Sequence, residues 1–324
     1  MRFLLSEGVG IVHFVAMRDS DDLTSRRLVH RIQLIEALES HMDGRHWDLA
    51  APGSELDGDD TLTAPFQTSH LVGHCLSISL EGIRTTRFIL QDHDPENASG
   101  IRLPMAGHYP ALRSAIEAGA EALWLMEPDD RRERVSRTLR ARWDDIIEDN
   151  KVMLALTSED KNDAKDDVRR KQQARKVNSN NVRTKKKRIR EVATKAGIPH
   201  DEMFLAHPGF GPVVEEAADV TGVASNYQYG MWRLISGLTH PSASRSLAMS
   251  VVKEMGESKD GTFMAEMTAS TQLTVAALDA ALLLHWHALN LAAKRGGREE
   301  YFFSAPPDIP LPPGWVRLFS GPQT

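Results

Sequence analysis

The chain has 324 residues, of which 41% are hydrophobic and 26% are charged, and its net charge is −6. This composition is typical of a globular protein with a sizeable core, and the length predicts about two domains or one extended helical domain. The single cysteine, Cys75, excludes an internal disulfide framework and a cysteine-rich metal site, and it fits a reducing, cytoplasmic setting. Because no run reaches the ~18 apolar residues of a membrane span and Met1–Met17 lacks a secretory signal pattern, we expect no membrane association.

The first 66 residues are predicted to form an N-terminal helical and irregular segment. Residues Met1–Met17 fit a short strand or a helix, and their apolar periodicity does not distinguish the two. Asp19–Asp22 marks the start of a helix whose apolar stripe continues to about Met42. Residues 44–65 are rich in glycine, aspartate and proline, so we predict a loop.

A mostly apolar helix is predicted at about Thr68–Leu90. His70 and His74 lie four residues apart on it, which is the spacing of a metal-binding pair. No acidic residue completes a recognised zinc pattern, and we therefore expect packing and hydrogen bonding from these histidines, and no metal site.

The next predicted helix begins at Tyr109, with Pro110 in a first-turn position that tolerates proline. Arg113 and Glu117 are four residues apart on this largely apolar helix. Such a pair contributes only ~0.3–0.5 kcal/mol on a surface, but a buried pair would fix the position of the guanidinium.

A long helical hairpin is predicted after this helix. Pro128–Asp130 ends the preceding helix and caps another, which continues, increasingly polar, to about Lys176. Asn178–Asn181 is predicted to be a turn, and a basic helix is predicted from about Val182 to Lys195.

Positive charge is concentrated in this hairpin, an insertion at about residues 150–197. Between Lys161 and Lys195 there are 14 Lys/Arg against 4 Asp/Glu, a balance of +10, whereas the rest of the chain has 25 basic and 41 acidic residues, or −16. A basic hairpin on an acidic body favours a phosphate-bearing partner, although long helix pairs are also charged for solubility alone. The candidate nucleic-acid-binding residues are Arg183, Lys185, Lys186, Lys187, Arg188 and Arg190.

The end of the basic helix has two interpretations. Residues Ile189–Ile198 resemble the first helix and turn of a bacterial helix-turn-helix motif, but the recognition helix that should follow is short and carries Asp201 and Glu202. Alternatively, Gly197 is the glycine that ends the helix.

The remaining elements complete a helical architecture. Thr262–Lys294 is predicted to be a long helix, apolar nearly all round in its second half, in the middle of a bundle, where His285 and His287 are packed. Six prolines after Gly296 indicate a tail over residues 296–324 that lies on the surface. The predicted fold class is therefore all-α, a main helical bundle at residues 67–295 with a long protruding basic helical hairpin.

The segment from Tyr227 to Arg245 holds the densest set of chemically capable side chains. If residues 231–240 are helical, Arg233, Ser236 and His240 share one face, and Pro241 ends the helix there. An arginine and a histidine suit metal-free RNA cleavage by the 2′-hydroxyl, in which histidine moves protons and arginine stabilises the pentacoordinate phosphate.

Two motifs carry a resemblance to a known superfamily: Tyr109-x-x-x-Arg113-x-x-x-Glu117 and Tyr229-x-x-x-Arg233-x-x-Ser236-x-x-x-His240. From Thr68 to Lys294 the chain resembles bacterial helical proteins similar to the HEPN superfamily, the small bundles of toxin–antitoxin and abortive-infection (phage-defence) systems. In that superfamily an arginine and a histidine separated by four to six residues form a metal-independent ribonuclease site, usually shared by a homodimer.

The resemblance implies a site and partners for this chain. Arg233 and His240, with Ser236, would be catalytic, and Arg113, Glu117 and Tyr229 would support them. RNA and a second copy of the chain would be the partners, with no metal and no small-molecule cofactor. The sequence departs from the pattern after the arginine, where a usually polar position is Leu234.

Three hypotheses follow. The chain is an RNase-like effector that uses Arg233 and His240; or it is a non-catalytic interaction protein in which Arg113, Glu117, Ser236 and His240 form a buried polar network that fixes the bundle; or it binds nucleic acid through the hairpin without catalysis.

Overall fold

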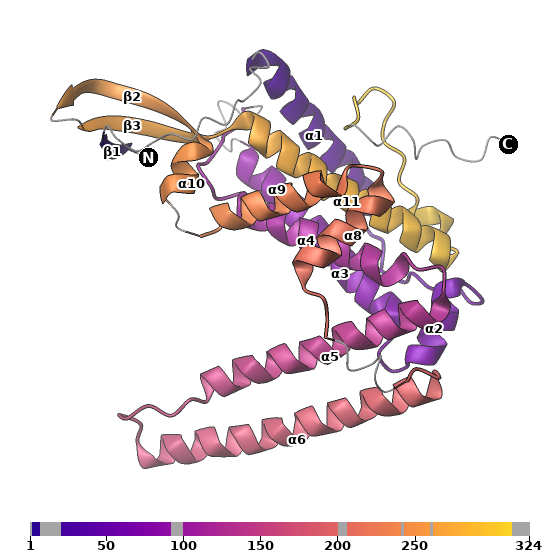
Figure 1. Cartoon of the computed structure of the whole chain (residues 1–324). Coiled ribbons are helices and arrows are strands. Elements are labelled where there is room, and N and C mark those ends of the chain that lie inside the picture. The colour runs from indigo at the N-terminus through magenta and orange to yellow at the C-terminus, as the bar shows by residue number, and fades with distance from the viewer. Residues whose placement is uncertain are drawn as a thin grey trace.

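The computed structural model describes residues 2–6, 21–91, 100–199, 206–240, 243–259 and 262–312. The described chain is mostly helical, which confirms the predicted helical bundle, and it includes one small sheet. Figure 1 shows a bundle of packed helices from which one long helix pair protrudes.

Three helices form the centre of the bundle: α3 (Thr68–Leu90), α4 (Tyr109–Met126) and α11 (Thr271–Gly296). The hydroxyl of Ser79 on α3 donates to the carbonyl of Ala115 on α4 at 2.9 Å, which shows how closely these helices approach. Helix α11 is apolar nearly all round, as predicted, and it buries His285 and His287. Among the described helices it is long and apolar enough to cross a membrane, but 78% of that apolar stretch is buried inside the bundle.

Shorter helices surround this centre: α1 (Asp21–Met42), α8 (Phe210–Thr221) and α9 (Ser225–Leu238). One hydrophobic core extends from Leu28 on α1 to Phe303, beyond α11. The segments predicted as N-terminal region and surface tail therefore both contribute side chains to the core of the main bundle.

The loop predicted at residues 44–65 contains a helix, α2 (Glu55–Thr63), so that part of the prediction was wrong. Gly58 and three aspartates make this segment a poor helix by propensity alone. The helix is stabilised instead by the Ser54 cap, by complete burial of Leu56 and by ion pairing of Asp59 with α5.

A three-stranded antiparallel sheet has the order β1-β3-β2. The strands are β1 (Arg2–Ser6), β2 (Ser250–Lys259) and β3 (Thr262–Ala269), and the short helix α10 (Ala243–Ala248) precedes β2. The prediction of one helix over Thr262–Lys294 was therefore wrong for its first nine residues. The helix begins only after Ser270, whose side chain caps it by accepting from the amide of Leu273.

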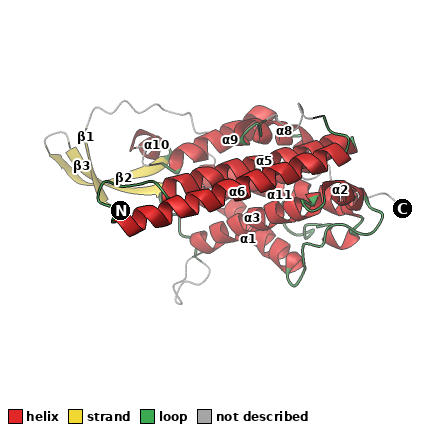
Figure 2. Ribbon diagram, turned by 90° about the horizontal axis from the view of Figure 1, so that it is seen from below, coloured by secondary structure: helices red, strands yellow, loops and turns green. Residues whose placement is uncertain are grey.

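The protruding hairpin consists of α5 (Arg131–Leu156) and α6 (Lys165–Lys195), which run side by side in Figures 1 and 2. Helix α5 begins after its Asp130 cap, as predicted, but the predicted turn at Asn178–Asn181 was wrong because these residues lie in the middle of α6. Asn178 donates across the pair to Asn150 at 2.7 Å, so a turn-forming residue has a partner that favours the helix. The chain reverses at residues 157–164 instead.

The base of the hairpin has its own apolar cluster. It contains Val135, Leu139, Trp143 and Ile146 of α5 with Ile189, Val192 and Ala193 of α6. Buried Arg134 on α5 donates to both carboxylate oxygens of Asp59 on α2, at 2.7 and 3.0 Å. Helix α6 ends at Gly197, whose φ of +70° and the Ile198-to-Ala193 backbone bond confirm the helix-ending interpretation. Most of the alternative recognition helix falls outside the described residues.

Candidate functional site

Helix α9 carries the predicted cluster. Met231, Ile235 and Leu238 face the core at helical spacing, which leaves Arg233 exposed on the opposite side. The helix ends at Leu238, two residues before the exposed His240.

Helix α4 is the partner of this stretch, as predicted. Arg113 Nε lies 2.8 Å from Glu117 Oε1, and the same carboxylate oxygen accepts from Trp232 Nε1 at 2.8 Å. An Arg113 guanidinium nitrogen also lies 3.5 Å from the Thr239 hydroxyl. Glu117 is only 15% exposed, and the network ties α4 to the middle of α9 through Trp232 and to its C-cap through Thr239.

The membership of the network differs from the predicted one. Trp232 and Thr239 occupy the places that were predicted for Ser236 and His240. The Ser236 hydroxyl is buried and has no hydrogen-bond partner in the described part of the chain, and His240 is exposed to solvent.

A second arginine, Arg245 of α10, lies against α9. A methyl group at Gly237 would overlap the Arg245 guanidinium, so this α10 side chain crosses the helix directly beside Ser236. Arg233 is one helical turn from Gly237, and His240 follows three residues later. The Arg245 guanidinium and Arg233 therefore lie near the C-terminal half of α9, and exposed His240 follows the end of the helix. Tyr229 packs on Trp232 with ring centroids 5.8 Å apart.

The six candidate nucleic-acid-binding residues on α6 do not all face the same way. Lys185 points toward α5 and lies 3.7 Å from an Asp149 oxygen. Lys186 and Arg190 lie over the Trp143 ring, 4.7 and 5.4 Å from its centroid. Arg183 and Lys187 lie on the face turned away from α5.

Because α6 is continuous, further cations join Arg183 and Lys187 on that face. The residues are Lys165, Arg169, Lys176, Arg183 and Lys187, and we call them the outer stripe. Their positions differ by 4, 7, 7 and 4, which keeps one face of a helix, and they cover about 33 Å at a rise of ~1.5 Å per residue. The predicted turn at Asn178–Asn181 concealed the first three, although the 4-7-7-4 spacing was visible in the sequence.

The outer stripe is mostly unneutralised. Two nearby acidic residues pair with other cations: Asp167 with Arg170, and Asp163 with Lys171. A third, Asp166, is exposed between Lys165 and Arg169. Of the stripe, Lys187 alone makes an ion pair within the described chain, at 3.7 Å from Glu191.

The opposite side of the hairpin is acidic. A cavity of about 660 Å³ lies between α3, α4 and α5, and its carboxylates are Glu117, Glu121, Asp144, Asp145 and Glu148. Burial raises the pKa of Asp145. Burial lowers the pKa of His207, but its hydrogen bond to Glu121 outweighs this effect and the pKa is raised.

Cys75 lines this cavity together with the carboxylates. Burial raises the pKa of the Cys75 thiol, so the nucleophilic thiolate is disfavoured. No three His, Cys, Asp or Glu side chains of the described residues are placed to hold a metal ion, and His70 and His74 are exposed.

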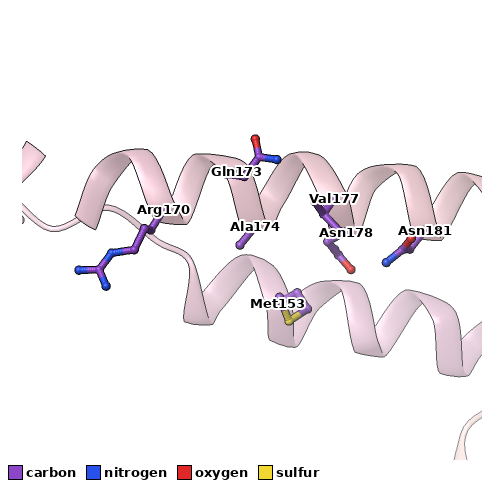
Figure 3. Close-up of a pocket in the computed structure, with 7 residues that line it drawn as sticks. All are labelled: Met153, Arg170, Gln173, Ala174, Val177, Asn178 and Asn181. Atoms are coloured by element: carbon purple, nitrogen blue, oxygen red, sulfur yellow. The ribbon is translucent and has the colours of Figure 1, made fainter. Parts of the chain in front are cut away.

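A second hollow, of about 540 Å³, separates the two helices in the distal half of the hairpin. Figure 3 shows Met153 of α5 and Ala174 and Asn178 of α6 directed into the space between the helices. Gln173 points away from α5, toward the face of the outer stripe. The distal half is thus loosely packed inside, and its surface exposes the apolar side chains of Val152, Leu154, Leu156 and Val177 among polar ones.

Comparison with protein-family models, curated proteins and solved structures finds no match for this chain.

Proposed function

We propose that the chain binds the phosphate backbone of nucleic acid through the outer stripe of α6. The observation that carries this proposal is the alignment of five cations over about 33 Å on one exposed helix face. Backbone binding is electrostatic and independent of base sequence, and it needs a row of cations rather than a pocket.

The arrangement has a cost to the helix that a solubilising surface would avoid. Lys165 and Arg169, and likewise Arg183 and Lys187, are like charges at i,i+4, and each pair destabilises the helix by about 0.2–0.5 kcal/mol. A face charged only for solubility would mix signs and gain from such pairs. A one-signed stripe on a chain with a net charge of −6 therefore favours a polyanionic partner.

The test compares two triple variants of equal charge. Arg169→Gln, Lys176→Gln and Arg183→Gln together remove the centre of the outer stripe. The control, Arg170→Gln, Lys171→Gln and Arg175→Gln, removes three cations that lie off the stripe, two of them bonded to Asp167 and Asp163.

Binding is measured by fluorescence anisotropy with labelled single strands and duplexes between 50 and 200 mM NaCl, conditions in which backbone contacts weaken steeply. The stripe variant should lower the slope of log K against log salt by about 2 to 3, because each lost phosphate contact removes almost one unit. The control should keep most of the slope. Equal losses in both variants would show that net charge, rather than the stripe, determines binding.

Cleavage at α9 is a second candidate function. The observation that favours it is Arg245, which brings a second guanidinium to the helix segment that carries Arg233 and His240. In this reaction His240 accepts the proton of a 2′-hydroxyl, whose oxygen attacks the adjacent phosphorus. The arginines stabilise the pentacoordinate phosphate. The bond from phosphorus to the 5′-oxygen then breaks, the 5′-oxygen takes a proton from water, and a 2′,3′-cyclic phosphate remains.

His240→Ala should then reduce RNA cleavage by about 100-fold or more, the usual contribution of a general base. His74→Ala, which removes an exposed histidine on α3, is the control. Equal cleavage by the wild type and His240→Ala would remove His240 from catalysis.

The two sites lie on different parts of the molecule. Figure 1 shows α9 within the bundle and α6 on the far side of α5 from it. Nucleic acid on the outer stripe of one copy would therefore face away from the Arg233–His240 pair of the same copy.

A further inference from the structure

We infer that the outer stripe is selective for double-stranded over single-stranded nucleic acid. This inference rests on the proposed backbone binding and adds the class of partner. Three features of the hairpin support it: the lack of accessible aromatic side chains, the straightness of α6 and the fixed attachment of its base.

Single-strand binding sites combine cations with aromatic rings on which unpaired bases stack. The hairpin, residues 131–199, contains one aromatic residue, Trp143. Its ring is only 8% exposed and is covered by Lys186 and Arg190. Unpaired bases would therefore find no stacking surface on the hairpin.

The outer stripe has the geometry of a rigid duplex. Because α6 is unbroken from Lys165 to Lys195, its five cations keep one line over about 33 Å, close to one turn of a nucleic-acid duplex. A duplex presents phosphates in a fixed array with about one charge per 1.7 Å of axis in DNA. A flexible single strand would have to be straightened along the same line, at a cost in conformational entropy.

The uncharged residues between the cations fit backbone contacts as well. Gln173 and Asn180 are exposed on this side of α6, and Figure 3 shows Gln173 directed away from α5. Side-chain amides form hydrogen bonds with phosphate and sugar oxygens, which are continuous along a duplex.

The base of the hairpin presents the stripe as a fixed element. Arg134 of α5 is held by Asp59 of α2, and Val135, Leu139 and Ile189 pack in the basal cluster. The stripe is therefore preorganised for a partner that is itself rigid.

The experiment uses the full chain and three labelled 30-mers of one mixed sequence: single-stranded RNA, duplex RNA and duplex DNA. Affinities are measured at several NaCl concentrations. We expect at least one duplex to bind about tenfold or more tightly than the single strand, because its higher charge density acts on the same cations. With five contacts, the salt slope should be about −4.5 on duplex DNA and about −3.5 on a single strand.

A gain-of-function variant sharpens the test. Gln173→Tyr with Asn180→Tyr places two aromatic rings on the stripe face, and single-strand affinity should rise about tenfold or more through stacking. The variant leaves every stripe cation in place, and circular dichroism checks that the helical content is unchanged.

The outcomes separate the two proposals. If the single strand binds as tightly as both duplexes or more tightly, and the stripe variant still weakens binding, the duplex inference is overturned and backbone binding stands. Absence of binding to all three 30-mers, or binding that the stripe variant does not weaken, overturns both. A preference for duplex RNA or duplex DNA alone supports the inference and identifies the sugar.

Discussion

The interior of the bundle and the distal half of the hairpin are both helical, but different forces stabilise them. Helices α4 and α11 are buried on nearly every side, and most of their buried side chains are apolar. The distal α5 and α6 are joined by polar bonds such as Asn178 to Asn150, and they leave Leu156 71% exposed. The outward face of α6 contributes no side chain to the core, so its charge is available for a partner.

The largest expected difference between the two regions is their response to acid. Burial lowers the pKa of His285 to about 3, and it lowers those of His108 and His287 to about 4. An unfolded chain binds protons at these positions near pH 6.5, whereas the folded chain does not until about pH 4. The unfolded state therefore holds more protons between these values, and stability falls as the pH is lowered.

By pH 5 the expected loss is about 2 kcal/mol for each histidine, or about 6 kcal/mol for three, since one pKa unit corresponds to ~1.4 kcal/mol. Urea unfolding at pH 7, 6 and 5 measures it. His285→Leu removes one of the three histidines and should therefore reduce the pH dependence by about a third. The substitution breaks no hydrogen bond of the described residues, because neither ring nitrogen of His285 has a partner there. Stability that is constant from pH 7 to 5 would contradict the prediction.

The next largest effect concerns the base that joins the two regions. Asp59→Ala removes the buried carboxylate that pairs with the Arg134 guanidinium, which is 1% exposed, and leaves it only the Glu55 carboxylate at 3.4 Å. The expected loss in unfolding free energy is about 3–5 kcal/mol. Asp167→Ala removes the exposed partner of Arg170 as a control and should cost less than about 1 kcal/mol. If the two variants are equally stable, the buried pair does not anchor the hairpin.

The smallest effect is expected in the distal half. Asn178→Ala removes the bond to Asn150 and should lower local stability by about 1 kcal/mol. Hydrogen exchange of the amides at residues 150–178 should become faster, with the bundle unchanged. Asn180→Ala, on the exposed side of the same helix, is the control, and equal acceleration there would exclude a specific role for Asn178.

The sequence was sufficient for features that depend on helical periodicity. Amphipathic stripes predicted most of the helices, the central position of α11 and the approach of Arg113 and Glu117 to α9. It was also sufficient for the basic hairpin, because local charge does not depend on tertiary contacts.

Features that depend on distant partners were missed. The helix at residues 55–63 requires Arg134, which lies more than seventy residues away from Asp59. Strands β2 and β3 stabilise each other by pairing, and the Met and Ala residues of β3 are equally compatible with a helix. The turn predicted at Asn178–Asn181 followed turn propensities, which the contact with Asn150 overrides.

The predicted turn at Asn178–Asn181 also concealed part of the outer stripe. A break in α6 would place Lys165, Arg169 and Lys176 on a separate helix, with no fixed direction relative to Arg183. The orientation of Arg245 over Gly237 depends on the packing of α10 against α9, which no periodic pattern encodes.

Because α6 is continuous, the angular positions of its cations around the helix axis are fixed relative to one another. One residue inserted near Asn180 would turn Lys165, Arg169 and Lys176 by about 100° relative to Arg183 and Lys187, because an α-helix has 3.6 residues per turn. Seven inserted residues would bring the two groups back to within about 20° of alignment and lengthen the row by about 10 Å. Binding through the outer stripe should therefore tolerate insertions and deletions of seven residues in α6 but not of one. The spacing of the cations is set by the length of the helix.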